Sequence, residues 1–233
     1  MKTIVLSMGV GEAWHELAEW THEFRKQWAE RTCPACLPCR LPVAVATQTG
    51  ARHRQALRGK GCEALTEIVT DADAKQMSSR PASWLKLRSI QRLIRDGHDV
   101  IWMDADGVPT GILTADMLRP QEESSIVVGN DCNGMNCGMM GFACSEWTNN
   151  LLTTWWDYPC DPNNAWWEQR ALRDMVEAGK FPGRVQTIPQ HLHFLHAAGI
   201  ASAGAKLAWL RNAIEANGTC LPTGRSGKEN DNR

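Results

Sequence analysis

Two aspartates that follow an apolar run are the residues of this sequence best suited to chemistry. Residues 100–103 are apolar and lead directly into Asp104-Ala105-Asp106. The run predicts a buried strand, and side chains two residues apart in an extended chain point the same way, so both carboxylates can share one cation. Mg²⁺ and Mn²⁺ prefer oxygen ligands and are commonly held by one or two carboxylates together with substrate phosphates. The pattern therefore predicts a divalent-metal site that neutralises a departing diphosphate.

A second Asp-x-Asp pattern occurs at Asp71-Ala72-Asp73, also after an apolar stretch. Such a short motif arises easily by chance, so the neighbouring residues must decide between the two copies. The strand before Asp104 is the stronger of the two. We expect a solvated loop at Asp71 and Asp73, because aspartate favours turns.

Three further polar residues have a structural reading beside a functional one. His196 lies among apolar residues, where a histidine is more often structural, although a neutral imidazole is also a good metal ligand. Lys86 and Lys206 fall on expected helices, where a lysine is by default a solvated charge. Their assignment depends on what surrounds them in the fold.

A cysteine-rich segment could hold a structural metal. Cys33, Cys36 and Cys39 have the spacing of tetrahedral zinc ligands, and Cys62 could be the fourth. The sequence contains no second Cys-x-x-Cys pair, so reduced or oxidisable thiols are the competing interpretation.

The elements that must position these residues alternate between strands and helices. Strands are expected at residues 3–8, 42–47, 64–70, 99–103, 125–129, 185–188 and 192–195. Helices are expected at residues 12–30, 83–96, 145–157, 163–179 and 203–216. This order predicts an α/β fold in which a mostly parallel sheet is flanked by helices, with ligands beyond the carboxyl ends of the strands. We expect one domain over residues 1–222, with a Cys/Pro/Arg-rich insertion at 31–62 and a flexible polar tail at 223–233.

Composition narrows the class of protein. The chain has 233 residues, 43% of them hydrophobic, and a net charge of −1, which argues against disorder and weakly against a nucleic-acid partner. No apolar run is long enough to span a bilayer, and the N-terminus does not read as a secretory signal. The nine cysteines are an odd number, which favours reduced thiols. We expect a cytoplasmic protein, of a bacterium or a virus-infected host cell, without a membrane partner.

Five segments in order resemble one family of enzymes. They are Trp84-Leu85-Lys86 before Trp102-Met103-Asp104-Ala105-Asp106, then Asn136-Cys137-Gly138, Trp147 with Trp155-Trp156, Glu168-Gln169 with Leu172, and His196-Ala197-Ala198-Gly199 with Lys206. Together they resemble the GT-A glycosyltransferases, nearest the α-galactosyltransferase and xyloglucan α-xylosyltransferase family, over about residues 84–210. The chain departs from that family at Glu168, where the family has aspartate, and residues 30–80 have no match.

The resemblance implies a metal-dependent transfer of a sugar from a nucleotide-sugar donor, most simply a UDP-sugar, with retention of configuration. It implies that Mn²⁺ or Mg²⁺ is held by Asp104, Asp106 and His196. Donor-binding residues would be Ser7, Thr47, Lys86, Asp104, Ala105, Gly199 and Lys206. A sugar and acceptor pocket would contain Asn136, Gly138 and Trp167, with Glu168 and Gln169 as the catalytic pair. Glu168 would act as nucleophile or orient the acceptor.

Two other functions remain as alternatives. Asp104-x-Asp106-Gly107-Val108 also resembles the first motif of haloacid-dehalogenase-type phosphohydrolases, in which the first aspartate is the nucleophile and the second the acid/base. That motif normally opens its fold, whereas about 100 residues precede it in this sequence. The second alternative is a binding module whose cysteine cluster is a zinc-stabilised contact surface.

The acceptor is a separate question. A saccharide, a protein or a small molecule fits, and one hypothesis is a hydroxymethylated pyrimidine of viral DNA that is flipped out and stacked on tryptophan. The arginines of the insertion motivate this hypothesis: Arg40, Arg52, Arg54 and Arg58.

Overall fold

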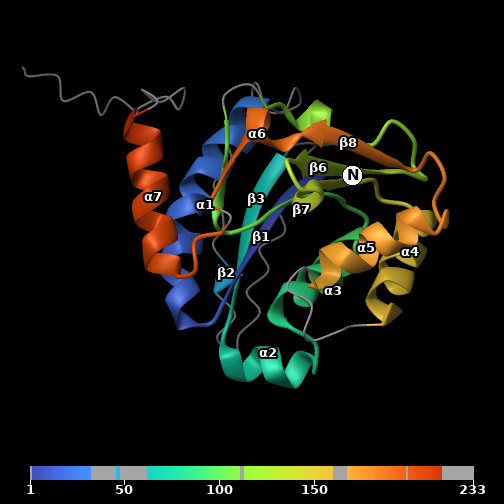
Figure 1. The fold of residues 1–233 in the computed structure, drawn as a ribbon, viewed down its shortest axis with the longest axis horizontal. Coiled ribbons are helices and arrows are strands. Elements are labelled where there is room, and N and C mark those ends of the chain that lie inside the picture. Colours follow the sequence, from blue (N-terminus) through green and yellow to red (C-terminus); the bar gives the residue numbers. More distant parts are fainter. Residues whose placement is uncertain are drawn as a thin grey trace, which may run out of the picture.

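A mixed seven-stranded sheet forms the centre of the molecule. The computed structural model describes residues 2–32, 46–47, 62–110, 113–159, 167–197 and 199–216. Within these ranges the strands of the sheet are β1 (Thr3–Val10), β2 (Ala46–Thr47), β3 (Cys62–Val69), β4 (Asp99–Met103), β6 (Ile126–Asp131), β7 (Gly134–Phe142) and β8 (Val185–Pro189). Their order is β2-β3-β1-β4-β7-β6-β8 (Figure 1), and only β7 runs against its neighbours. The predicted mixed, mostly parallel sheet is confirmed.

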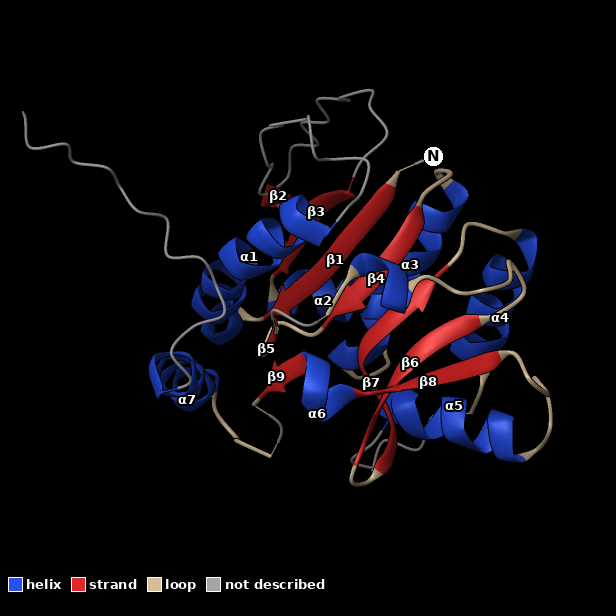
Figure 2. Cartoon of the chain, turned by 90° about the horizontal axis from the view of Figure 1, so that it is seen from above, coloured by secondary structure: helices blue, strands red, loops and turns tan. Residues whose placement is uncertain are grey.

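Helices cover both faces of the sheet (Figure 2). They are α1 (Glu12–Thr32) on one face, and α3 (Leu85–Arg95), α4 (Glu146–Asp157) and α5 (Trp167–Glu177) on the other. Successive strand side chains alternate between the faces. Leu6 and Trp102 therefore pack with the residues of α3, α4 and α5, while Val5 and Ile101 pack with Trp28 of α1. The helix α7 (Ala203–Ala216) packs on the outer side of α1 through Leu207 and Leu17.

Short elements complete the described part of the chain. A second sheet pairs β5 (Gly107–Pro109) with β9 (Phe194–His196) in antiparallel fashion. The other short elements are α2 (Asp71–Met77), α6 (Gln190–His193) and the 3₁₀ turns η1 (Ala82–Trp84) and η2 (Ala115–Leu118). No helix in these ranges is long and apolar enough to cross a membrane.

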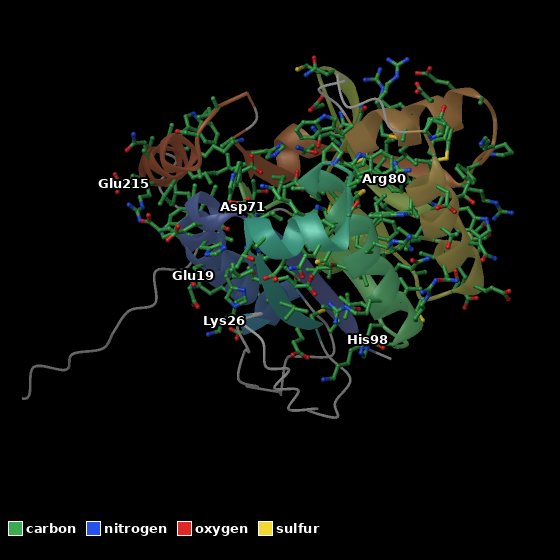
Figure 3. All side chains as sticks on the ribbon, turned by 90° about the horizontal axis from the view of Figure 1, so that it is seen from below. Glu19, Lys26, Asp71, Arg80, His98 and Glu215 are labelled. Atoms are coloured by element: carbon green, nitrogen blue, oxygen red, sulfur yellow. The ribbon has the colours of Figure 1, made fainter. Side chains whose placement is uncertain are left out.

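Two expectations from the sequence are corrected by these elements. Residues 192–195 were expected to be a strand, but the helix α6 continues through His193 and the strand begins only at Phe194. Asp71 and Asp73 lie in the first turn of α2 instead of a loop, because Thr70 Oγ1 accepts a hydrogen bond from the Asp73 amide and caps the helix. In Figure 3, Asp71 lies at the end of α2 that is nearer α1, and Arg80 lies beyond the other end of that helix.

A close approach between β7 and η2 fixes the position of the antiparallel strand. A Cβ atom at Gly141 would lie 1.6 Å from the backbone oxygen of Leu118. Backbone cannot yield as a flexible side chain would, so only glycine fits at this place in β7. β7 carries Asn136 and Gly138 to the acidic pair, and the site therefore depends on this contact.

We predict that Gly141→Ala destabilises the protein by about 3 kcal/mol or more, because overpacking against backbone forces β7 and η2 apart. Urea unfolding of the variant measures the loss. Gly204→Ala is the matched control, since a Cβ there has open space and alanine favours the helix α7. An equal stability of wild type and Gly141→Ala would contradict the prediction.

Candidate metal centre and cavity

The acidic pair lies just beyond the carboxyl end of β4, at the edge where the parallel strands end. The Asp104 amide donates to the Gly138 oxygen at 2.8 Å, which continues the pairing of β4 with β7. The small β5–β9 sheet then brings His196 opposite Gly107. As a result one ligand atom from each of Asp104, Asp106 and His196 lies within 4.8 Å of the others. Two carboxylates and an imidazole are a ligand set that fits a divalent cation such as Mn²⁺.

The imidazole of His196 is held from both sides. Its Nε2 lies 3.1 Å from Asp106 Oδ1 and 3.8 Å from Asp104 Oδ2, and its Nδ1 lies 3.1 Å from Nε2 of Gln190. Space beside it depends on Gly138, where a Cβ atom would lie 3.1 Å from His196 Cε1 and 3.2 Å from Asp104 Oδ2. The absence of a side chain at residue 138 keeps these ligand groups close together.

Lys206 of α7 completes the charge balance around Asp106. Its Nζ donates to Asp106 Oδ2 and, at 2.8 Å, to the Ala197 oxygen. Although burial opposes ionisation, the hydrogen bond from His196 and the charge of Lys206 hold the pKa of Asp106 well below its usual range. Burial would lower the pKa of His196, but its hydrogen bond to Asp106 raises that pKa above the ordinary value. Asp106 is therefore a carboxylate at neutral pH.

Lys86 of α3 plays the corresponding part for Asp104. Its buried Nζ lies 3.1 Å from Asp104 Oδ1, 2.9 Å from Glu168 Oε1 and 3.3 Å from the Cys137 oxygen. Burial would lower the pKa of Lys86, but Asp104 and then Glu168 raise it above its usual range. The ammonium group is therefore permanently charged and joins the two carboxylates.

A cavity of about 440 Å³ opens beside these groups. Of the predicted site residues, Lys86, Asp104, Ala105, Asp106, Trp167, Glu168 and Gln169 line it. Met8, Val10 and Trp14 supply apolar surface, and Ala82, Ser83 and Trp102 complete the lining. Its size and its mixture of apolar walls with a few charged groups are typical of a small-molecule site.

The start of α5 places Glu168 and Gln169 at this cavity. Trp155 Nε1 donates to the backbone oxygen of Glu168 at 2.7 Å, and Gln169 Oε1 accepts from the Cys137 amide at 3.0 Å. Within the described part of the chain, the buried Nε2 of Gln169 has no hydrogen-bond partner. A buried donor without a partner is costly, and a bound ligand with an acceptor oxygen would remove that cost.

Trp167 precedes this pair with an uncommon backbone. Its φ is +28°, whereas few residues other than glycine have positive φ, and its side chain is 39% exposed. Strained backbone of this kind is often found at ligand sites. The indole of Trp167 is partly exposed and lines the cavity.

The helix α1 contacts the backbone between Asp104 and Asp106. Thr21 Oγ1 lies 2.8 Å from the Ala105 oxygen and accepts a hydrogen bond from Arg25 Nη1 at 2.9 Å. Burial lowers the pKa of Arg25 to about 9, while Asp104 and Asp106 oppose that shift. The guanidinium is therefore charged at neutral pH and lies behind the two aspartates.

Other predicted site residues are not brought to the cavity. Ser7 is fully buried within β1, and Thr47 lies in β2 at the edge of the sheet. Asn136 uses its side chain within the fold, accepting from the Gly138 amide at 2.7 Å and donating to Asp131 at 2.7 Å. Gly199 is exposed in the turn after β9, with a φ of +79°. Their roles in binding stay predictions.

The predicted zinc site falls mostly outside the described residues. Cys33, Cys36 and Cys39 lie outside them, and Cys62 is the first residue of β3. Arg40, Arg52, Arg54 and Arg58 also lie outside the described ranges, so the zinc and DNA hypotheses stay predictions.

Sequence reasoning missed three residues of the site. Trp102 Nε1 donates to Asp104 Oδ1 at 2.7 Å, and its place in β4, two residues before Asp104, was a signal that could have found it. Trp14 reaches the cavity from α1 and Gln190 contacts His196. Both depend on contacts between segments distant in sequence, and no local pattern identified them.

Comparison with known proteins places this geometry in a known fold. No protein-family model matches the chain, and no curated protein matches it significantly. A glycosyltransferase involved in the glycosylation of the major capsid of PBCV-1 has a similar structure, with a TM-score of 0.63, 11% identity, and coverage of 91% of this chain and 100% of that one. The chain has a glycosyltransferase fold. The glycosyltransferase GlyE of Streptococcus pneumoniae TIGR4 is also similar, with a TM-score of 0.50 and 11% identity over 96% of this chain, which spans 66% of that protein's length.

We predict that Lys86→Met lowers the free energy of unfolding by about 3 kcal/mol at pH 7, because the buried carboxylate of Glu168 and the partly buried carboxylate of Asp104 lose the cation that they share.

Urea unfolding at pH 7 measures the loss. Lys75→Met, on the exposed helix α2, is the matched control and should unfold as the wild type does. A Lys86→Met variant as stable as the wild type would contradict the prediction.

Proposed function

We propose that the chain is a metal-dependent glycosyltransferase that moves a sugar from a nucleotide-sugar donor, a UDP-sugar, to a hydroxyl acceptor with retention. The observation that carries the proposal is the approach of Asp104, Asp106 and His196 beside a cavity that also contains Lys86, Glu168 and Gln169. The fold shared with known glycosyltransferases supports the same conclusion. The five segments that resemble the α-galactosyltransferase and xyloglucan α-xylosyltransferase family favour that family as the nearest relative.

The proposed chemistry divides between the two ends of the cavity. Asp104, Asp106 and His196 would hold Mn²⁺ or Mg²⁺, which supplies charge neutralisation for the leaving nucleoside diphosphate. Lys206 lies beside this centre and adds a further positive charge for the diphosphate. In the proposal the diphosphate therefore lies at the Asp106 end of the cavity.

The sugar would lie at the opposite end, toward α5. Nε2 of Gln169 has no hydrogen-bond partner among the residues that the structure describes, so it can donate to a sugar or acceptor oxygen. Glu168, which also lines the cavity, is the carboxylate nearest to it in the chain. Lys86 Nζ lies 2.9 Å from Glu168 Oε1 and fixes the position of this carboxyl group. Glu168 is therefore suited to stabilise positive charge that develops on the sugar, or to orient the acceptor hydroxyl. The indoles of Trp14, Trp102 and Trp167 offer flat surfaces for the C–H faces of a saccharide.

The phosphohydrolase alternative is less well supported by the surroundings of the motif. Gly107 has a packing reason, because a Cβ there would lie 2.0 Å from the Phe194 ring. Asp104 Oδ1, which would be the nucleophile, is shared by Lys86 and the Trp102 indole. Both oxygens of Asp106, the would-be acid/base, are engaged by His196 and Lys206.

We predict that UDP together with Mn²⁺ raises the melting temperature of the wild type, and that Asp104→Asn/Asp106→Asn abolishes this shift. A ligand that binds only the folded state stabilises it by about 2.7 kcal/mol at a 100-fold excess over Kd. A thermal-shift panel of nucleoside diphosphates and nucleotide sugars, each with and without Mn²⁺, measures the effect and identifies the nucleotide.

Asp71→Asn/Asp73→Asn is the matched control, because it alters the other Asp-x-Asp pattern at the start of α2. This control should keep the full metal-dependent shift. A wild type that responds to no nucleotide would refute the transferase, and phosphorylated substrates with Mg²⁺ would then test the hydrolase. Once a donor is known, saccharides and hydroxymethylated DNA at low salt can be compared as acceptors.

A further inference from the structure

The side chain of Gln190 lies behind the proposed metal centre, on the far side of His196. It is 3% exposed, and its Nε2 is 3.1 Å from Nδ1 of His196. The other ring nitrogen, Nε2, faces Asp106 and Asp104. Gln190 therefore contacts the ring nitrogen that the metal does not need. It is absent from the segments that resemble the glycosyltransferase family.

Space for the Gln190 carboxamide is made by a glycine in β6. The register of β6 with β7 shifts between Val128 and Gly129, and a Cβ atom at Gly129 would lie only 2.2 Å from Gln190 Oε1. The helix α6, which begins at Gln190, packs against β6. A strand irregularity and a residue without a side chain together accommodate this one amide.

The chemistry of metal-binding histidines suggests a role for the contact between Gln190 and His196. A histidine that binds a metal through one ring nitrogen carries its proton on the other, and that N–H normally donates to an acceptor in the protein. For Nε2 of His196 to bind a cation, Nδ1 must carry the proton and needs an acceptor. Gln190 has an acceptor, Oε1, which is buried and has no hydrogen-bond partner within the described residues.

Half a turn of the carboxamide about its terminal bond exchanges its oxygen and nitrogen. With Nε2 toward Nδ1, the amide donates to the bare ring nitrogen, and His196 Nε2–H donates to Asp106. With Oε1 toward Nδ1, the amide accepts from Nδ1–H and leaves the lone pair of His196 Nε2 directed at the two aspartates. The same side chain can thus serve the ring in both proton arrangements.

We propose that Gln190 is a positioning residue that fixes the ring orientation and tautomer of His196 for metal binding, in the space that Gly129 provides. This inference rests on the proposed metal centre. Gln190 itself touches neither metal nor substrate in this proposal.

Metal affinity without any nucleotide is the direct test. Isothermal titration calorimetry with MnCl₂ compares the wild type with Gln190→Met, which has a similar length but no acceptor, and with Gln190→Glu, whose carboxylate accepts from Nδ1–H. Loss of an acceptor behind a metal-binding histidine typically weakens the metal by about 10- to 100-fold. We expect that loss in Gln190→Met and affinity at least equal to wild type in Gln190→Glu. Gly129→Ala, which displaces the carboxamide, should weaken Mn²⁺ binding as Gln190→Met does.

Matched controls separate this role from general damage. Gln186→Met changes a half-buried glutamine of the neighbouring strand β8, and Gly204→Ala adds a Cβ atom in open space. Both should bind Mn²⁺ as the wild type does, and melting temperatures without metal verify that each variant is folded.

Two results would overturn the inference while the proposed function stands. One is a folded Gln190→Met that binds Mn²⁺ as tightly as the wild type. The other is a folded Gln190→Glu that binds as weakly as Gln190→Met, since a purely structural role would not be rescued by the carboxylate. If the wild type binds neither Mn²⁺ nor a nucleotide, the proposed function fails and the inference fails with it.

Discussion

The buried ammonium group of Lys86 is the contact on which the rest of the site depends. It joins Asp104, at the end of a sheet strand, to Glu168, in the first turn of α5. The Lys86 ammonium and the Glu168 carboxylate lose nearly all of their hydration on burial, and Asp104 loses part of its own, so the arrangement is favourable only when all three charges are present. The indole of Trp102 and the Cys137 oxygen satisfy further hydrogen-bonding groups. The sheet edge, α3 and α5 are thereby held in one arrangement around the cavity.

The other half of the acidic pair has separate support. Asp106 is linked to His196 and Lys206, which come from the last strand and the last helix of the described chain. The β5–β9 pairing and the packing of α7 on α1 hold these partners in place. The two aspartates thus pair with different lysines, and His196, whose Nε2 lies 3.1 Å from Asp106 Oδ1 and 3.8 Å from Asp104 Oδ2, lies between the two networks. A cation bound between them would connect the two networks directly.

The sequence predicted much of the scaffold because its signals there are local. The strand before Asp104 and the helix over residues 145–157 were predicted correctly, and Ser145 Oγ caps that helix by accepting a hydrogen bond from the Thr148 amide. β7 was missed, since Gly134–Phe142 is largely buried on both faces and rich in glycine, so no alternation of polar and apolar residues marks it. The joining of Lys86 to Glu168, and of Gln190 to His196, depends on contacts between distant segments. No local pattern in a single sequence indicates which distant residues form such pairs.

The separation of the site residues along the chain has a consequence for the protein while it is being made. Asp106 lies 90 positions before His196 and 100 before Lys206. Chains are synthesised from the N-terminus, so the acidic pair leaves the ribosome long before its partners do. The nascent chain can form β1, α1 and β4 without possessing a complete cation site. The cluster of Asp104, Asp106 and His196 can therefore form only after β9 has emerged and docked, and Lys206 joins Asp106 only after α7 has done so.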